Sequence, residues 1–156
     1  ADDAVTAAKI SDAVGLGKIG QVVSATVSSD TEITTNSGTV AGATASITPT
    51  ATSSKVIVLF HCPMLMDANS NAYAEVRLFR GSTQIMIASD ITCYSYNNVT
   101  MTDFFSINFL DSPSSTSSLT YQCKFYEHGS STLKLMDTSG SGGVGTSSMT
   151  LMEVLA

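Results

Sequence analysis

The sequence predicts an all-β protein, an antiparallel β-sandwich or jelly roll with a short N-terminal stalk or connector segment. Three observations support this fold class. The chain of 156 residues holds 24 Ser and 20 Thr but only 13% charged residues, which suits short strands and polar turns better than helices. Apolar and polar residues alternate along many short segments. Turn-forming residues separate these segments, as is typical of antiparallel sandwiches and barrels.

The first twenty residues contain an internal repeat with a period of nine. The segment Asp3–Ile10 aligns with Asp12–Ile19, and Asp, Ala, Val, Lys and Ile recur in place. Two copies of so short a unit cannot bury their own apolar side chains. We therefore expect residues 1–20 to be a connector that packs in an oligomer. The apolar residues expected at that subunit interface are Val5, Ile10, Val14 and Ile19.

Residues 21–156 are expected to form the sandwich. Gln21–Val27 alternates loosely, Ser28–Ala45 is interpreted as short edge strands and turns, and Ala45–Ile47 leads into a turn. Lys55–Cys62 has the strongest strand pattern, and Met64–Met66 is a candidate continuation beyond a break at Pro63. Both of its faces are apolar, as expected of a central strand buried between two layers.

Alternation is clearest in the second half of the chain. Tyr73–Arg80 and Thr83–Ala88 are expected to form a hairpin around Gly81. The further strands expected are Met101–Leu110, Leu119–Glu127, Thr132–Met136 and Ser147–Leu155. The side chains expected to point inward on two of them are Phe105, Ile107 and Phe109, then Leu119, Tyr121, Cys123 and Phe125. An eight-stranded jelly roll fits this count best.

Some apolar residues fall opposite the inward-pointing sets. The aromatic ones are Phe79, Phe104 and Tyr126, and Met86 and Met152 accompany them. Single exposed apolar residues mean little, but a group of them marks a subunit interface. We therefore treat Phe79, Phe104 and Tyr126 as candidate interface residues.

Charge and hydropathy exclude two classes of partner. Seven Lys+Arg stand against 13 Asp+Glu, a net charge of −6, so no basic face for nucleic acid is expected. The longest apolar run, Val56–Phe60, is far shorter than the roughly 20 residues of a membrane-spanning helix. The sequence thus predicts neither a nucleic-acid nor a membrane partner.

No pattern of catalytic or metal-binding residues is evident. Cys62, Cys93 and Cys123 match no CxxC-type spacing and are expected to be small buried hydrophobes, with a disulfide as the alternative. His61 is expected in the core or at an interface, and His128 in a solvated turn. The sequence lacks GxSxG, HExxH and a phosphate-binding loop followed by a helix. We expect no enzymatic activity, cofactor or metal.

The candidate recognition loops are Met66–Tyr73, Cys93–Val99, Asp111–Ser118 and Ser139–Ser147. Of these, Cys93–Val99 has the side chains best suited to a ligand. Tyr94, Tyr96, Asn97 and Asn98 combine aromatic faces with amide hydrogen-bonding groups, which suits sugars. An ordinary loop with partly buried rings is the alternative. Separately, Glu75 and Arg77 share a strand face and are expected to form an ion pair.

Five segments carry a resemblance to a known family. They are Gly17–Val23, Ser46–Val58, Leu78–Ile85, Phe109–Pro113 and Met149–Leu155. With them the chain resembles the fibre-type virion proteins of tailed phages, including cyanophages, and the leading repeat is similar to repeats that precede such domains. At the level of fold, the strand count is similar to the trimeric C1q/TNF-like jelly roll.

The resemblance implies a structural protein located in the virion, on the tail or the capsid surface. It implies a homotrimer, a tail fibre or other appendage that contacts the host surface. Residues 1–20 would join it to other virion proteins, and a host surface glycan is a further possible partner. The alternatives are a capsid-surface decoration or head-fibre protein and a glycan-binding module.

Overall fold

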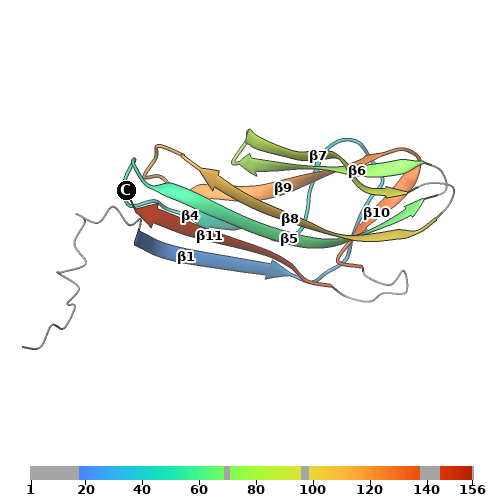
Figure 1. The fold of residues 1–156 in the computed structure, drawn as a ribbon, viewed down its shortest axis with the longest axis horizontal. Helices are drawn as coiled ribbons and strands as arrows, with labels where there is room; N and C mark the ends of the chain where they lie inside the picture. The colour runs from blue at the N-terminus through green and yellow to red at the C-terminus, as the bar shows by residue number, and fades with distance from the viewer. Residues whose placement is uncertain (1–17, 69–70, 96–98, 138–144, 156) are drawn as a thin grey trace, which may run out of the picture.

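The computed structural model describes residues 18–68, 71–95, 99–137 and 145–155 (Figure 1). These parts of the chain contain strands but no helix, and they form two antiparallel sheets packed as a sandwich. The strands are β1 (Lys18–Val27), β2 (Thr31–Ile33), β3 (Thr39–Val40), β4 (Ala45–Ile47), β5 (Lys55–Ala68), β6 (Ala72–Arg80), β7 (Thr83–Ser95), β8 (Met101–Asp111), β9 (Leu119–His128), β10 (Ser131–Leu135) and β11 (Ser147–Leu155). The predicted all-β sandwich is confirmed.

The strand order is that of a jelly roll. Sheet A runs β1-β11-β5-β8, and β10 and β2 extend it beside the second half of β5. In sheet B, β3 and β4 both pair with β9, which is followed by β6 and β7. We count β3 and β4 as one interrupted strand, leave out the short strands β2 and β10, and number the other strands of the described chain 1 to 8 along the sequence. Sheet A (β1-β11-β5-β8) then has the order 1-8-3-6, and sheet B (β3/β4-β9-β6-β7) has the order 2-7-4-5. This pairing of two four-stranded sheets is the jelly-roll arrangement.

The core lies between the two sheets and follows from the period-two alternation. On β5, Val56, Val58 and Phe60 point inward, and from the opposite sheet Tyr121 and Phe125 meet them. The Phe60 ring lies 6.3 Å from that of Phe105 and 6.2 Å from that of Phe125, both tilted. The inward sets predicted for β8 and β9 are confirmed, with Phe109 and Leu119 only partly buried at their margins.

A buried polar cluster ties the two sheets together near one end. Asp111 on β8 accepts hydrogen bonds from Arg80 Nη1 at 2.9 and 2.7 Å and from the Tyr121 hydroxyl at 2.6 Å. Burial, and then the bond to Asp111, raise the pKa of Tyr121. Because Asp111 belongs to sheet A while Arg80 and Tyr121 belong to sheet B, the cluster fixes the relative position of the layers.

Two strands extend beyond their predicted ends. β5 runs through Pro63 and the candidate continuation Met64–Met66 to Ala68, and β7 continues to Ser95, with Cys93 at a positive φ of 52°. The segment Cys93–Ser95, predicted as part of a loop, therefore belongs to a strand. At the N-terminal side, β1 begins at Lys18, so the last three residues assigned to the connector are part of the sandwich.

Candidate assembly surface

The outer face of sheet A carries three rows of uncharged side chains across four neighbouring strands. The residue partners that define the rows, in the order β1, β11, β5, β8, are Val22–Met152–Ile57–Leu110, Ser24–Thr150–Leu59–Asn108 and Thr26–Ser148–His61–Ser106. Their sequence neighbours point into the core, which places these residues on the opposite, outer side. We call this surface the sheet A face.

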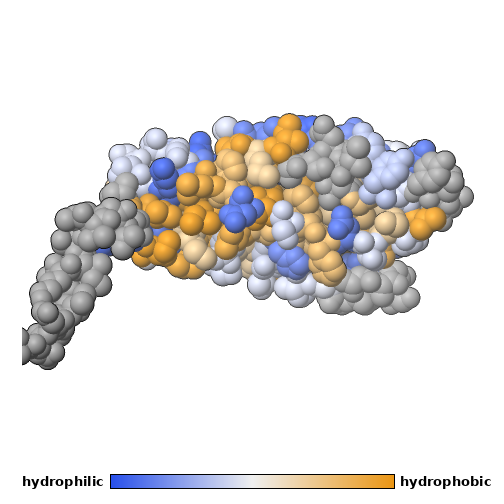
Figure 2. Space-filling model, in the orientation of Figure 1, coloured by the Kyte–Doolittle hydropathy of each residue, from blue (hydrophilic) through white to orange (hydrophobic). Residues whose placement is uncertain are grey.

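The first row of the sheet A face is entirely apolar and strongly exposed at its edges. Val22 is 57% exposed and Leu110 is 51% exposed, while Ile57 and Met152 between them are half-buried by their neighbours. Beside this row, Ile19 pairs with Val154 and is 49% exposed. Figure 2 shows hydrophobic residues gathered at this end of the molecule, where β1 begins and β11 ends in Figure 1.

An aromatic pair lies further along the sheet A face. The His61 and Phe104 rings are stacked, 5.8 Å apart between centroids and 9° from parallel. Phe104 is 65% exposed, which agrees with its expected outward position. His61 is partly exposed on the outer face. The prediction that both faces of Lys55–Cys62 are buried between layers was wrong. Val56, Val58 and Phe60 face the core, whereas Ile57, Leu59 and His61 are partly exposed on the outer side of sheet A.

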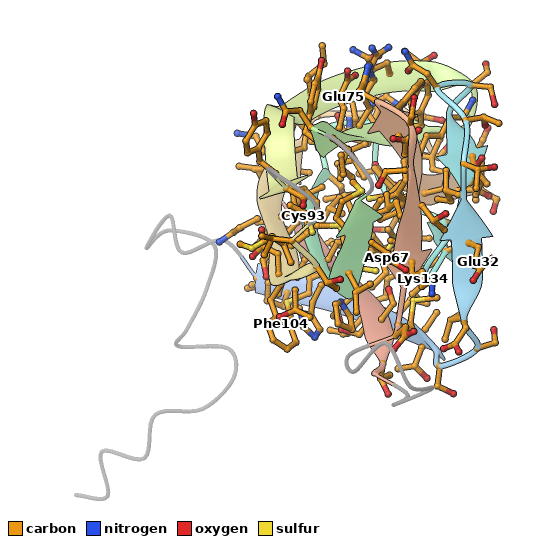
Figure 3. All side chains as sticks on the ribbon, turned by 90° about the vertical axis from the view of Figure 1, so that its right-hand side faces the viewer. Glu32, Asp67, Glu75, Cys93, Phe104 and Lys134 are labelled. Atoms are coloured by element: carbon orange, nitrogen blue, oxygen red, sulfur yellow. The ribbon has the colours of Figure 1, made fainter. Side chains whose placement is uncertain are left out.

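The outer face of sheet B has the opposite chemistry. The Glu75 carboxylate accepts a hydrogen bond from Arg77 Nε, and its Oε2 atom lies 3.1 Å from His128 Nε2. His128 is also stacked on Tyr73, with centroids 4.6 Å apart. The expected Glu75–Arg77 pair is confirmed, whereas the placement of His128 in a solvated turn was wrong because β9 extends to that residue. Figure 3 shows Phe104 and Glu75 at opposite sides of the sandwich.

Two of the candidate interface residues lie on this charged side and are covered by cations. The Lys124 ammonium lies 4.4 Å from the centre of the Phe79 ring, and the Arg77 guanidinium lies 4.4 Å from that of Tyr126. Phe79 is only 8% exposed, so it differs from the expectation of an outward, uncovered ring. Such cation–π contacts shield apolar rings from water within one subunit.

The remaining sequence candidates divide between described and undescribed parts of the chain. Val5, Ile10 and Val14 of the repeat lie outside the described residues, as do Tyr96, Asn97 and Asn98. Tyr94 lies on β7 and is 44% exposed. Sequence reasoning missed Val22, Ile57, Leu59 and Leu110 as surface residues. The signal was present in the doubly apolar β5, but it was interpreted as burial inside one subunit.

The three cysteines are free and buried, as expected of small hydrophobic residues. Burial raises the pKa of Cys62 to about 12 and that of Cys93 to about 11, and it also raises the pKa of Cys123. A thiol with such a pKa is almost fully protonated at neutral pH and reacts slowly. The cysteines therefore contribute packing to the core.

The described residues hold neither a candidate metal cluster nor a candidate membrane-spanning helix. No group of three or more His, Cys, Asp or Glu side chains is arranged to hold a metal ion there. Within the same ranges, no helix has the length and apolar character needed to cross a membrane.

Comparisons with known proteins gave matches among solved structures. No family model matches the chain, and no curated protein matches it. The structure of infectious bursal disease virus strain Gx is similar over 87% of this chain, with 10% identity and a TM-score of 0.43. The VP2 subviral particle of the same virus is similar over 87%, with 13% identity and a TM-score of 0.40. This chain covers 40% and 38% of those chains.

Proposed function

We propose that this protein is a structural virion protein of a tailed phage, a homotrimeric tail fibre or appendage whose head contacts the host surface. The observation that carries the proposal is the sheet A face, where three rows hold no charged side chain. One of these rows, Val22–Met152–Ile57–Leu110, is apolar, and grouped exposed apolar residues form interaction surfaces in soluble proteins. The resemblance of the sequence to fibre-type virion proteins supports the same function.

Assembly gives the proposed function its mechanism. Each subunit is a rigid jelly roll, and apolar burial between subunits holds several copies in one particle. Several copies engage the host surface together, so weak single contacts combine into firm attachment. The N-terminal repeat joins the head to the rest of the virion.

The oligomeric state of the purified full chain tests this proposal. Size-exclusion chromatography with light scattering at micromolar concentration is expected to give about three times the 16.2 kDa subunit mass. A species of 16.2 kDa at these concentrations contradicts the trimer.

The position in the virion separates a tail fibre from a capsid-surface decoration or head fibre. Antibody against the purified chain, viewed by electron microscopy on intact particles, is expected to label tails or their appendages. Label confined to the capsid surface would replace the tail-fibre assignment with the decoration alternative.

A further inference from the structure

We infer that the sheet A face packs against a second copy of this chain, at the end of the sandwich where β1 begins. The inference rests on the proposed homo-oligomer and names the surface through which it forms. The contact centres on the apolar row Val22–Met152–Ile57–Leu110 and on Ile19 and Val154 beside it.

The chain preceding β1 identifies a second copy as the occupant. Residues 1–17 lie outside the described structure and join the sandwich at Lys18. Ile19 occupies the same repeat position as Ile10, and it is also 49% exposed beside the apolar row. Of the four apolar repeat positions named above, the structure describes Ile19, which lies beside the first row of the sheet A face. Where repeats from several copies pack together, the faces that follow them are brought together as well.

The size of the sheet A face makes it the centre of a subunit contact. Four strands at about 4.8 Å spacing span ~19 Å, and the three rows extend along β5 from Ile57 to His61, ~17 Å at about 3.3 Å per residue. The product, ~320 Å² of flat area, is less than half of the ~800 Å² of accessible surface that each partner buries in a standard interface, so the side chains around the rows complete the contact. Two such contacts per subunit in a closed ring add to the buried area.

The charge distribution selects sheet A over sheet B. Charged side chains at the margin of the sheet A face, Lys18 and Lys55, lie at the outermost paired positions beside Leu155 and Val154. The outer face of sheet B instead carries the partly exposed cations Arg77 and Lys124, beside Glu75, which is only 5% exposed in the single subunit. Burying the two cations carries a desolvation penalty. The apolar row and its neighbours Ile19 and Val154 carry no such penalty, and the polar side chains of the other two rows need only hydrogen-bond partners when they are buried.

A matched pair of aspartate substitutions tests the inference on the full chain. Leu110 on β8 and Ile87 on β7 are each 51% exposed, and they belong to different sheets. We expect L110D to raise the concentration for half-assembly at least tenfold and V22D to do the same, while I87D assembles like the unchanged protein. Circular dichroism of all three variants checks that the β-sandwich is retained.

Each outcome is informative. If the unchanged protein, L110D and V22D are all oligomeric, the sheet A face is not the interface, and the proposed oligomer is unaffected. Loss of assembly in I87D alone moves the contact to sheet B and also overturns the inference. A monomeric unchanged protein overturns both the inference and the proposed homotrimer.

Cross-linking gives a second, independent readout. Because the native cysteines Cys62, Cys93 and Cys123 are buried, a surface cysteine introduces a single reactive thiol in the described chain. Under mild oxidation I19C is expected to form covalent dimers between subunits, while I87C is not. Equal cross-linking of both variants contradicts an interface at the β1 end.

Discussion

Glu153 and Glu127 are two buried carboxyl groups whose surroundings shift their pKa values in opposite directions. Glu153 on β11 is fully buried. Burial by itself raises its pKa, but hydrogen bonds from the Thr50 amide at 2.6 Å, the Thr50 hydroxyl at 2.7 Å and Gln21 at 3.2 Å lower it to about 2. Glu127 on β9 has an Oε1 atom without a hydrogen-bond partner among the described residues, and burial raises its pKa.

We expect Glu153 to make the protein sensitive to acid. Its folded pKa, about 2, lies below the ordinary value of 4.5. The stabilisation is therefore complete above pH 4.5 and is lost as the pH falls toward 2. Urea unfolding of the unchanged protein and of E153Q should show a stability difference that is largest near pH 7 and shrinks between pH 4.5 and 2. A difference that stays constant over this range would contradict the ionised, hydrogen-bonded state.

Glu127 should show the reverse dependence. A folded pKa above the ordinary value means that its contribution is most favourable at low pH and is lost as the pH rises through the folded pKa. We expect E127Q, which cannot ionise, to gain stability relative to the unchanged protein as the pH rises from 4 to 8. The expected gain at pH 8 is about 1 kcal/mol, the lower end of the cost of an unsatisfied buried group. Chemical unfolding at both pH values measures it, and a gain only at pH 4 would refute it.

At the scale of the element, β5 shows what sequence pattern predicts well and what it does not. The apolar run from Val56 to Cys62 predicted the strand, and Pro63 suggested an interruption before Met64–Met66 because proline donates no ladder hydrogen bond. The strand continues because Pro63 lies where β5 changes neighbours, from β11, whose pairing ends at His61, to β10, whose pairing begins at Met64. This exchange of partners depends on the later strands, so no local pattern reveals it.

The turn before β3 provides a prediction for a single element. Gly38 and Gly81 both have positive φ, +74° and +57°, but a Cβ on Gly38 would lie 2.6 Å from the Tyr126 ring, whereas nothing lies within 4 Å of one on Gly81. We expect the free energy of unfolding to fall by about 1 kcal/mol in G81A, through backbone strain alone. In G38A we expect it to fall by about 2–4 kcal/mol, through backbone strain and overpacking against Tyr126. Thermal or urea unfolding compares them. Equal losses would mean that Tyr126 moves away without cost.

At the scale of the whole molecule, the sequence predicted the sandwich far better than its surfaces. Alternation identified inward residues such as Phe105 and Tyr121, because burial within a sheet follows period two. It could not separate Phe79, covered by Lys124, from Phe104, which is exposed. Both rings point outward on their strands, and only the pairing of β6 with β9 brings the lysine to one of them. Coverage of an outer face depends on neighbouring strands or subunits.

His61 gives the last prediction, which concerns the assembled molecule. It lies in the third row of the sheet A face, flanked by Ser148 and Ser106 and stacked on Phe104. A permanent charge at this position must be desolvated when two copies meet. We therefore expect H61K to raise the half-assembly concentration at least tenfold, and H61L to lower it because an apolar side chain is buried there instead.

Light scattering across a dilution series measures both variants, with I87K as the control for an added charge on the other sheet. The three proteins should have similar urea midpoints, since residues 61 and 87 are partly or largely exposed in the single subunit. If H61K assembles as tightly as I87K, the interface does not reach the third row of the sheet A face. A larger effect in H61K than in I87K extends the contact along β5 to the aromatic pair, because only a charge within the buried area is desolvated by assembly.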